Sequence, residues 1–300
     1  MNAYDVVVIG GGAAGLNAAL VLGRARRRVA VVDAGEPRNA PAAHMQGFLS
    51  RDGMPPAELL SVGRAEVAGY GVDLVDGRVA GIEPGFAVRL TDGTTLGARR
   101  IVVATGLRDE LPEVPGVAER WGRDVIHCPY CHGWEVRDQA IGVLAGEARS
   151  VHQAVMVKQW SDDVVFFAHE YALTAEDRQQ LDARRIPVVE GPVARLVVAD
   201  DVIRGVELRG GRVVERSAIF VAPRFVPIDG LLRELGCEVD NGLVKVDQFG
   251  RTTVDGVWAV GNVVTPMASV VMAAAAGAAA AMVVNGDLVE EEVSAARIAG

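Results

Sequence analysis

The chain has 300 residues, of which 50% are hydrophobic, 23% charged and 5% aromatic, and its formal net charge is −9. This composition predicts a globular protein with a large core in one or two domains. The acidic balance argues against a nucleic-acid partner, because binding a phosphate backbone requires a concentrated positive surface. Three cysteines are too few for a scaffold of structural disulfides, so we expect a reducing, cytoplasmic location.

The first 33 residues carry the clearest pattern. Residues 4–9 are a short apolar run, which predicts a strand buried on both faces. A glycine-rich turn at 10–15 leads into a helical stretch through about residue 23, and a second strand at 29–32 ends at Asp33. Asp33 follows Gly10 at about the 20-residue spacing of a dinucleotide-binding βαβ unit. This segment therefore predicts a bound dinucleotide.

Each residue of this motif has an expected role. Gly10 permits a tight turn, Gly12 lets the backbone approach a pyrophosphate, and Gly15 lets the helix pack closely on the strand. The phosphates would then meet free N–H groups at the positive end of the helix. Asp33 would accept hydrogen bonds from the adenosine ribose.

The pattern partly repeats further along the chain. A helix is expected at 57–69, followed by short strands over 72–104 that end in the turn Ala104, Thr105 and Gly106. Residues 140–160 form a second strand–turn–helix, with another strand at 164–167. Strands return near residues 244 and 257. This order favours an α/β protein of two domains, the second inserted in the first.

An apolar run at 267–284 has the length of a membrane span. It is rich in alanine and glycine, whereas a span normally carries more leucine, isoleucine and phenylalanine. We therefore expect a buried, closely packed helix and no membrane partner.

The segment 127–132 reads His-Cys-Pro-Tyr-Cys-His and is the most chemically reactive stretch. Cys128 and Cys131 are spaced to close a small disulfide ring. The alternatives are a zinc site, a c-type haem attachment motif, a glutaredoxin-like thiol pair and two inert buried thiols. No second ligand cluster supports zinc, no export signal supports haem, and the motif lies mid-chain rather than near the start of a small thioredoxin fold. A redox-active dithiol beside a flavin is favoured. Cys237 is expected on a surface turn or strand, with a structural role.

Together these motifs resemble the thioredoxin reductase family of flavoproteins over about residues 4–288. The resemblance is carried by Gly10, Gly12 and Gly15, the turn 104–106, the Cys-x-x-Cys, and Gly261-Asn262 before the long helix. Within the family, Cys-Pro-Tyr-Cys-His-Gly-Trp-Glu is similar to a branch that includes dithiol oxidases of holomycin and gliotoxin type.

The resemblance implies two Rossmann-like three-layer domains. The FAD-binding domain would comprise residues 1–112 and 225–300, and residues 113–224 would form a pyridine-nucleotide-type domain carrying the dithiol. It also implies a homodimer without a metal. The implied FAD-binding residues are Gly10, Gly12, Ala14, Gly15, Asp33, Ala104, Thr105, Gly106, Gly261, Asn262 and Ser269.

Several departures from the family pattern bear on function. Where the family has Gly-Gly-Gly-Asp-Ser-Ala at its second nucleotide turn, this chain keeps one glycine and carries Glu147. Glu170 stands where the family has an arginine that recognises the 2′-phosphate of NADPH. Both carboxylates would repel phosphate, so NADPH use is doubtful. Asn262 replaces an aspartate but can still bond the ribityl chain, Ser269 replaces a glutamine near the flavin, and His132 replaces an aspartate.

The implied reaction is thiol–disulfide exchange between FAD and a substrate dithiol or disulfide, with Cys128 as the interchange thiol and Cys131 nearer the flavin. His132 is the expected proton acceptor. His127 is a weaker acid–base candidate, and His44 is a possible flavin or substrate contact. The alternatives are an NADPH-dependent thioredoxin reductase and a non-catalytic flavin-binding redox sensor. The substrate and the final electron donor or acceptor are not specified by these residues.

Overall fold

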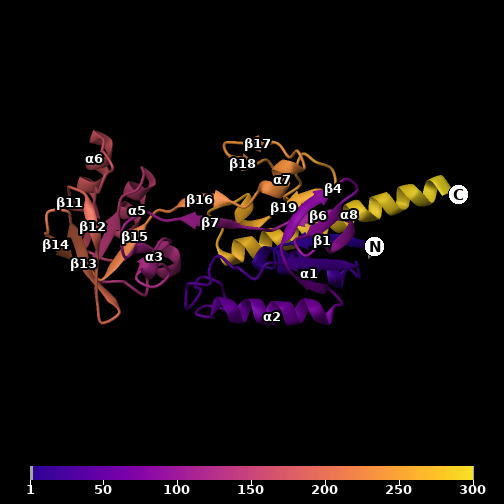
Figure 1. Ribbon diagram of the computed structural model, residues 1–300, viewed down its shortest axis with the longest axis horizontal. Helices are drawn as coiled ribbons and strands as arrows, with labels where there is room; N and C mark the ends of the chain where they lie inside the picture. The colour runs from indigo at the N-terminus through magenta and orange to yellow at the C-terminus, as the bar shows by residue number, and fades with distance from the viewer. Residues whose placement is uncertain (1–2, 300) are drawn as a thin grey trace. The chain divides into compact units, whose positions relative to one another are not determined.

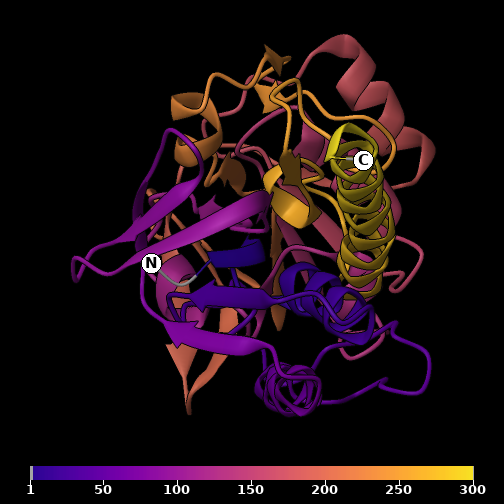
Figure 2. The same ribbon diagram turned by 90° about the vertical axis from the view of Figure 1, so that its right-hand side faces the viewer.

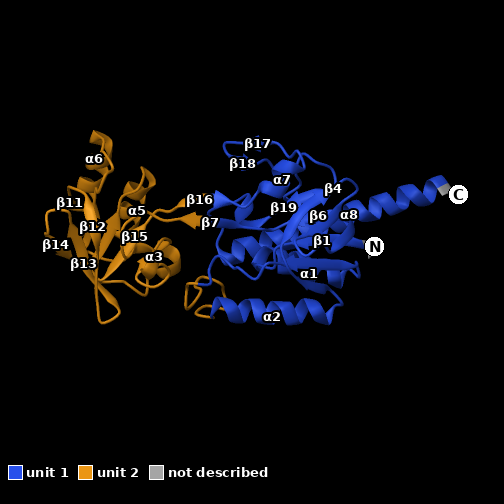
Figure 3. Ribbon diagram, viewed as in Figure 1, with its two compact units in different colours: residues 1–40, 55–108, 226–300 blue, residues 41–54, 109–225 orange. Residues whose placement is uncertain are grey.

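The computed structural model describes residues 3–299, which form two compact units (Figure 3). Unit 1 contains the chain up to residue 40, residues 55–108, and the chain from 226 onward. Unit 2 contains residues 41–54 and 109–225. The expected boundaries were 1–112, 113–224 and 225–300. The main difference from them is that the loop 41–54 groups with unit 2. The expected α/β class is confirmed, since each unit is built on a parallel sheet that carries helices.

Unit 1 contains, within the described residues, a seven-stranded sheet in the order β3-β2-β1-β6-β5-β4, with β19 also paired to β6 (Figure 1). Strands β1, β2, β3, β6 and β19 run parallel, and β4 and β5 add an antiparallel edge. The bounds are β1 Ala3–Ile9, β2 Val29–Asp33, β3 Asp73–Asp76, β4 Val79–Glu83, β5 Ala87–Leu90, β6 Thr95–Val103 and β19 Val257–Ala259.

The central strands of unit 1 are buried on both faces because their side chains alternate between two cores. Val6 and Val8 of β1 pack into a cluster with helices α1 and α8. Val7 and Ile9 point into the opposite cluster, which includes Leu232. An uninterrupted apolar strand is the pattern expected for a parallel sheet covered on both sides. The helical elements are α1 Ala13–Arg24, α2 Pro56–Gly69, α7 Gly230–Glu234, the 3₁₀ turn η1 Gly261–Val263 and α8 Val270–Ala299.

Helix α8 packs along α1 (Figure 2) and continues well past the apolar run expected at 267–284. Among the described residues, it is the helix long and apolar enough to cross a membrane by length and composition. Ala280, Ala281, Val284 and Leu288 of α8 are fully buried in the unit 1 core. The expected burial holds for one face only, because Met272, Met282, Val289 and Val293 of the same helix are exposed.

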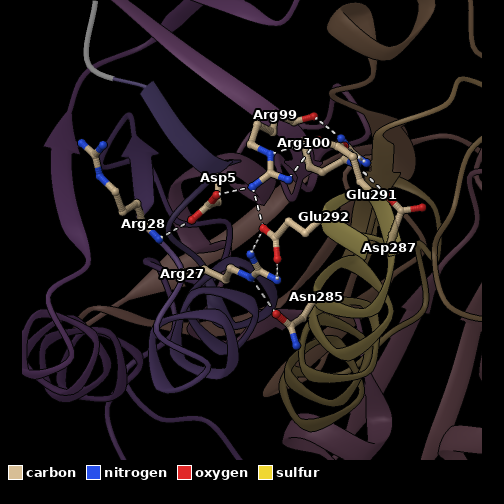
Figure 4. A network of polar contacts seen from close by, with 9 residues as sticks. All are labelled: Asp5, Arg27, Arg28, Arg99, Arg100, Asn285, Asp287, Glu291 and Glu292. Carbon is tan, nitrogen blue, oxygen red and sulfur yellow. Dashed lines mark hydrogen bonds and ion pairs between the residues drawn. The ribbon is translucent and has the colours of Figure 1, made fainter. Parts of the chain in front are cut away.

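The second half of α8 is held by ion pairs (Figure 4). Arg100 bonds Asp287 and Glu291, and Arg99 bonds Glu291 and Glu292. Glu292 also pairs with Arg27, and these contacts lower the pKa of its carboxyl to about 2. The Arg27 side chain is 12% exposed and lies against α8.

Unit 2 contains a parallel sheet in the order β11-β10-β9-β15-β8 and an antiparallel sheet β12-β13-β14. Cores lie on both faces of the parallel sheet. The strands are β8 Val125–Ile126, β9 Ile141–Leu144, β10 Val164–Phe167, β11 Val188–Val189, β12 Val193–Ala199, β13 Val202–Leu208, β14 Val213–Glu215 and β15 Ala218–Val221. The helices are α3 Val117–Arg120, α4 Pro129–His132, α5 Arg149–Val157 and α6 Ala175–Ala183.

Two short strand pairs lie outside these sheets. Strands β7 Leu107–Glu110 and β16 Arg224–Pro227 pair where the chain passes from one unit to the other. Strands β17 Val239–Asp240 and β18 Leu243–Val244 form an antiparallel pair in unit 1.

Candidate active site

The first turn, residues 10–15, lies between β1 and α1. Gly10 has a left-handed φ of 109°, and a Cβ there would lie 2.4 Å from the Ala104 carbonyl oxygen. A Cβ on Gly15 would lie 1.9 Å from the Gly10 carbonyl oxygen. Both positions therefore require glycine. A Cβ on Gly12 would meet nothing within 4 Å, so the space in front of the helix start is open.

Gly12 is also the N-cap of α1, and no side chain caps this helix. The first N–H groups of a helix have no partners within the helix. The start of α1 thus combines unpartnered donors, the positive end of the helix dipole and free space, which suits an anion such as a pyrophosphate.

Asp33 and the turn 104–106 lie at the same sheet edge as the first turn. The Asp33 carboxylate accepts hydrogen bonds from Gly35 N and from Arg64 Nη1, each at 3.3 Å. Thr105 Oγ1 donates to the Ile228 carbonyl at 2.7 Å, and Gly106 O accepts from Ile228 N at 3.0 Å. The turn 104–106 therefore ties the first part of unit 1 to the part that follows residue 226.

The start of α1 also meets η1 and α8. A Cβ on Gly261 would lie 3.0 Å from Ala14 Cβ, and one on Gly277 would lie 2.0 Å from the Ala14 carbonyl oxygen. Asn262 Nδ2 donates into the loop before α8, 2.9 to 3.2 Å from the carbonyl oxygens of Thr265, Pro266 and Ala268. The amide nitrogen of Asn262 thus shapes this loop, and Oδ1 is its atom that remains for a cofactor. Ser269 immediately precedes α8.

The FAD candidates of unit 1 thus lie around one open helix start, and they fit the cofactor. The first turn would hold the pyrophosphate and Asp33 the adenosine ribose. Gly277 and Gly11 belong to the same arrangement but were missed by the sequence reasoning. A Cβ on Gly11 would lie 2.5 Å from Asp33 Oδ2, so this glycine brings the carboxylate against the turn. The available signal for Gly277 was a glycine that interrupts the alanine run 273–281.

In unit 2, Cys128 and Cys131 form a disulfide with a Cα–Cα distance of 5.2 Å. Cys128 is the N-cap of the four-residue helix α4, and its carbonyl accepts from Cys131 N and His132 N, both at 3.1 Å. The Tyr130 ring lies edge-on to Trp160 with centroids 5.6 Å apart. A Cβ on Gly133 would lie 2.9 Å from the Trp160 ring, so Gly133 allows Trp160 to pack under the dithiol segment.

His132 is partly buried beside this disulfide. Its Nδ1 atom is buried and has no hydrogen-bond partner among the described residues. Burial lowers the pKa of the imidazole below its ordinary value, while Glu135 acts in the opposite direction. At neutral pH the ring is therefore neutral and can accept a proton.

The second turn, residues 145–150, lies between β9 and α5 and differs in its chemistry from the first. The buried Ser150 Oγ accepts from Gly146 N at 3.2 Å and, more weakly, from Glu147 N at 3.5 Å. Glu147 forms an ion pair with Arg149, and Arg149 also donates to the Pro223 carbonyl at 2.9 Å. Ser150 thus engages the N–H groups of Gly146 and Glu147, and the Glu147–Arg149 ion pair lies beside them.

The segment after β10 is likewise engaged within unit 2. Glu170 pairs with Arg209 at 3.2 Å. His169 Nδ1 accepts from Val193 N at 2.9 Å, and burial lowers the pKa of its imidazole.

The remaining candidates have distinct surroundings. His44 is exposed, and its Nδ1 contacts the Gly53 carbonyl at 3.0 Å within the loop 41–54. His127 Nδ1 contacts the Val221 carbonyl at 3.0 Å, and the buried Gln153 also bonds this region. The expected surface position of Cys237 is wrong. It is 6% exposed and packs in the unit 1 core, because the apolar face of α7 lies beside it, and burial raises its thiol pKa. Across residues 3–299, no group of three His, Cys, Asp or Glu side chains could hold a metal ion.

Comparison with known proteins identifies the family. The family described as pyridine nucleotide-disulphide oxidoreductase matches residues 4–278. The chain belongs to this family.

Among its relatives, thioredoxin reductase sirT of Leptosphaeria maculans is 31% identical over 296 residues, covering 90% of each chain. Thioredoxin reductase tcpT of Claviceps purpurea is 32% identical over 288 residues, covering 87% of each. The crystal structure of HlmI is 59% identical, with a TM-score of 0.97 over 98% of this chain and 95% of that one. The expected resemblance to thioredoxin reductases is thus confirmed. The protein is a thioredoxin reductase-like flavoprotein oxidoreductase, FAD is its cofactor, and enzymes of this kind act on dithiol or disulfide substrates.

Proposed function

We propose that the protein is an FAD-dependent dithiol oxidase that takes electrons from a substrate dithiol through Cys128–Cys131 and makes little or no use of NADPH. The observation that carries this proposal is the second turn. A nicotinamide dinucleotide needs N–H donors and open space at a helix start for its pyrophosphate. At residues 145–150, Ser150 accepts those N–H groups and the Glu147–Arg149 ion pair lies beside them.

The charge at two positions supports the same conclusion. Glu147 would repel an incoming pyrophosphate, and its pairing with Arg149 engages a cation that could otherwise bind phosphate. After β10, Glu170 pairs with Arg209, a cation that could otherwise bind a 2′-phosphate. NADPH would have to break both ion pairs, which disfavours its binding.

The proposed exchange uses residues of unit 2. One substrate thiolate attacks Cys128 Sγ, which breaks the Cys128–Cys131 bond, forms a mixed disulfide and releases Cys131 as a thiolate. The second substrate thiolate attacks the substrate sulfur of the mixed disulfide, which forms the product disulfide and releases Cys128. The substrate loses two electrons and two protons, and the cysteine pair gains the two electrons. His132, neutral at pH 7, accepts one of the protons, and the other passes to solvent.

When bound to unit 1, FAD supplies the two-electron acceptor that returns the cysteine pair to a disulfide, before electrons pass to an external acceptor such as oxygen. The residues that would hold it are those of the first turn, with Asp33 at the ribose. A homodimer and a cytoplasmic location stay predictions.

The test is anaerobic absorbance of the FAD-loaded protein after separate addition of dithiothreitol, NADPH and NADH. We expect the dithiol to bleach the flavin band and both nicotinamides to act at least about 100-fold more slowly. Rapid bleaching by NADPH would instead make the protein a thioredoxin reductase in the strict sense. Failure of every reductant to act would favour a redox sensor. Cys131→Ser is the control, because it should retain FAD and lose reduction by dithiol.

A further inference from the structure

Helix α5 makes an unexpected connection between the second turn and the dithiol. Gln153, one helical turn after Arg149, is 6% exposed. Its Nε2 donates to the His127 carbonyl at 2.7 Å and to the Val221 carbonyl at 2.9 Å. The His127 carbonyl belongs to the peptide bond that immediately precedes Cys128. The buried Gln153 amide therefore fixes the backbone next to Cys128 by hydrogen bonding.

The same amide accounts for the state of the His127 ring. Both N–H groups of Gln153 are used by the two carbonyls, so its longer contact with His127 Nδ1, at 3.4 Å, is not a donated hydrogen bond. His127 Nδ1 lies 3.0 Å from the Val221 carbonyl, which can only accept. His127 Nδ1 therefore carries a proton and donates it to this carbonyl, which ties His127 to the end of β15.

A second contact path runs from the ion pair of the second turn. The Arg149 guanidinium lies 4.9 Å from the centre of the Phe225 ring, and this ring meets the His127 ring edge-on at 5.2 Å. Arg149 also donates to the Pro223 carbonyl at 2.9 Å. Through Phe225, Arg149 thus connects the second turn to His127, the residue before Cys128.

We propose that Gln153, assisted by Arg149, is a positioning residue that holds the peptide before Cys128 and thereby favours the closed disulfide. Arg149, which pairs with Glu147 at the second turn, thus has a second role in supporting the backbone beside the redox centre. The proposal rests on the proposed function only in taking Cys128–Cys131 as the working pair.

The physical reason is conformational. Opening the disulfide lets the two sulfur atoms separate, and the dithiol gains freedom that the closed ring lacks. A fixed backbone at residues 127–128 limits that gain and keeps the effective concentration of one thiol near the other high. Removing the Gln153 hydrogen bonds should therefore favour the dithiol. The disulfide–dithiol equilibrium shifts whenever the Gln153 hydrogen bonds stabilise one of these two states more than the other.

The test is the disulfide–dithiol equilibrium of the FAD-loaded protein, measured by anaerobic thiol trapping in dithiothreitol redox buffers. Gln153→Met keeps the side-chain length but removes both donors. We expect it to shift the equilibrium constant about tenfold toward the dithiol, which corresponds to about 30 mV. Arg149→Met should give a smaller shift in the same direction. The matched control is Gln179→Met, because Gln179 is exposed on α6 of the same unit.

Gln153→Glu provides a readout specific to the hydrogen bonds. A protonated carboxyl group has one O–H donor and a carboxylate has none. Relative to the parent protein at each pH, its shift toward the dithiol should therefore grow as the pH rises. This variant and Arg149→Met keep the proposal testable if Gln153→Met does not fold. If the Gln153 and Arg149 variants all have equilibrium constants within twofold of the Gln179→Met control, the proposed role of Gln153 is overturned.

The two proposals fail separately. The trapping experiment reports the state of the cysteines whichever reductant acts on the flavin. Rapid flavin reduction by NADPH would overturn the proposed function and leave the proposed role of Gln153 intact.

Discussion

The two glycine-containing turns of this protein occupy equivalent places in two βαβ units but have opposite surroundings. The first turn, between β1 and α1, has an uncapped helix start and free space at Gly12. The second turn, between β9 and α5, has its N–H groups bonded to Ser150 and an ion pair beside them. Under the proposed function, the first turn receives a dinucleotide and the second does not.

Under the proposed function, the second unit keeps a nucleotide-type fold while its dinucleotide binding is lost. In both units a parallel strand leads through the turn into a helix packed on the sheet. What differs is a handful of side chains at the helix start. Fold similarity therefore supports the family, whereas the ligand must be argued from each turn.

The largest expected effect is a difference in the free energy of unfolding between alanine substitutions in the two turns. Gly15→Ala places a Cβ 1.9 Å from the Gly10 carbonyl oxygen, and we expect it to destabilise unit 1 by about 3 kcal/mol or more. Gly146→Ala is the matched variant in the second turn. Its Cβ would lie 3.9 Å from the Ala222 carbonyl oxygen, so we expect a change within about 0.5 kcal/mol. Urea unfolding of both variants measures the difference, and equal losses would refute the contrast.

Gly12→Asp should separate binding from folding in the first turn. The space at Gly12 accommodates the side chain, and aspartate is a good N-cap residue, so the stability of the FAD-free protein should change by less than about 1 kcal/mol. The new carboxylate would occupy the pyrophosphate position, so we expect a colourless protein. Absorbance at the flavin band and FAD titration measure this outcome. Stoichiometric FAD in this variant would contradict the placement of the pyrophosphate.

The smallest expected effect comes from removing the Glu147 and Ser150 side chains of the second turn. The double variant Glu147→Gly, Ser150→Ala removes the carboxylate and the acceptor that engages Gly146 N. Because phosphate would gain freed donors, we expect NADPH to bind at least about tenfold more tightly than to the parent protein. Calorimetric titration of both proteins measures the change. Unchanged affinity would mean that other residues exclude the nicotinamide.

Local sequence patterns were sufficient for the first turn and the dithiol, because their residues lie close together in the chain. The strand at 4–9, the glycines at 10, 12 and 15, and the pair Cys128 and Cys131 all lie in short, regular motifs. The sequence also indicated the difference between the two turns, since Glu147 stands where the family has a glycine at the start of a helix.

The features that escaped prediction depend on contacts between distant segments. Gly277 meets Ala14 across the α1–α8 contact, and Gln153 reaches the carbonyl of His127 from another element. Cys237 was expected on the surface, because its Leu-Gly-Cys-Glu context resembles a turn, yet α7 buries it. No local periodicity records such pairings. The length of α8 was underestimated for the same reason, since its charged second half is held by arginines far away in sequence.

The most direct test of the contrast between the turns is equilibrium binding of NADPH to the FAD-loaded parent protein, followed by calorimetry up to about 1 mM NADPH. We predict one tightly held FAD per chain and no saturable binding of NADPH in this range. Saturable binding with a dissociation constant in the micromolar range would contradict it, because a filled second turn could not then exclude a dinucleotide.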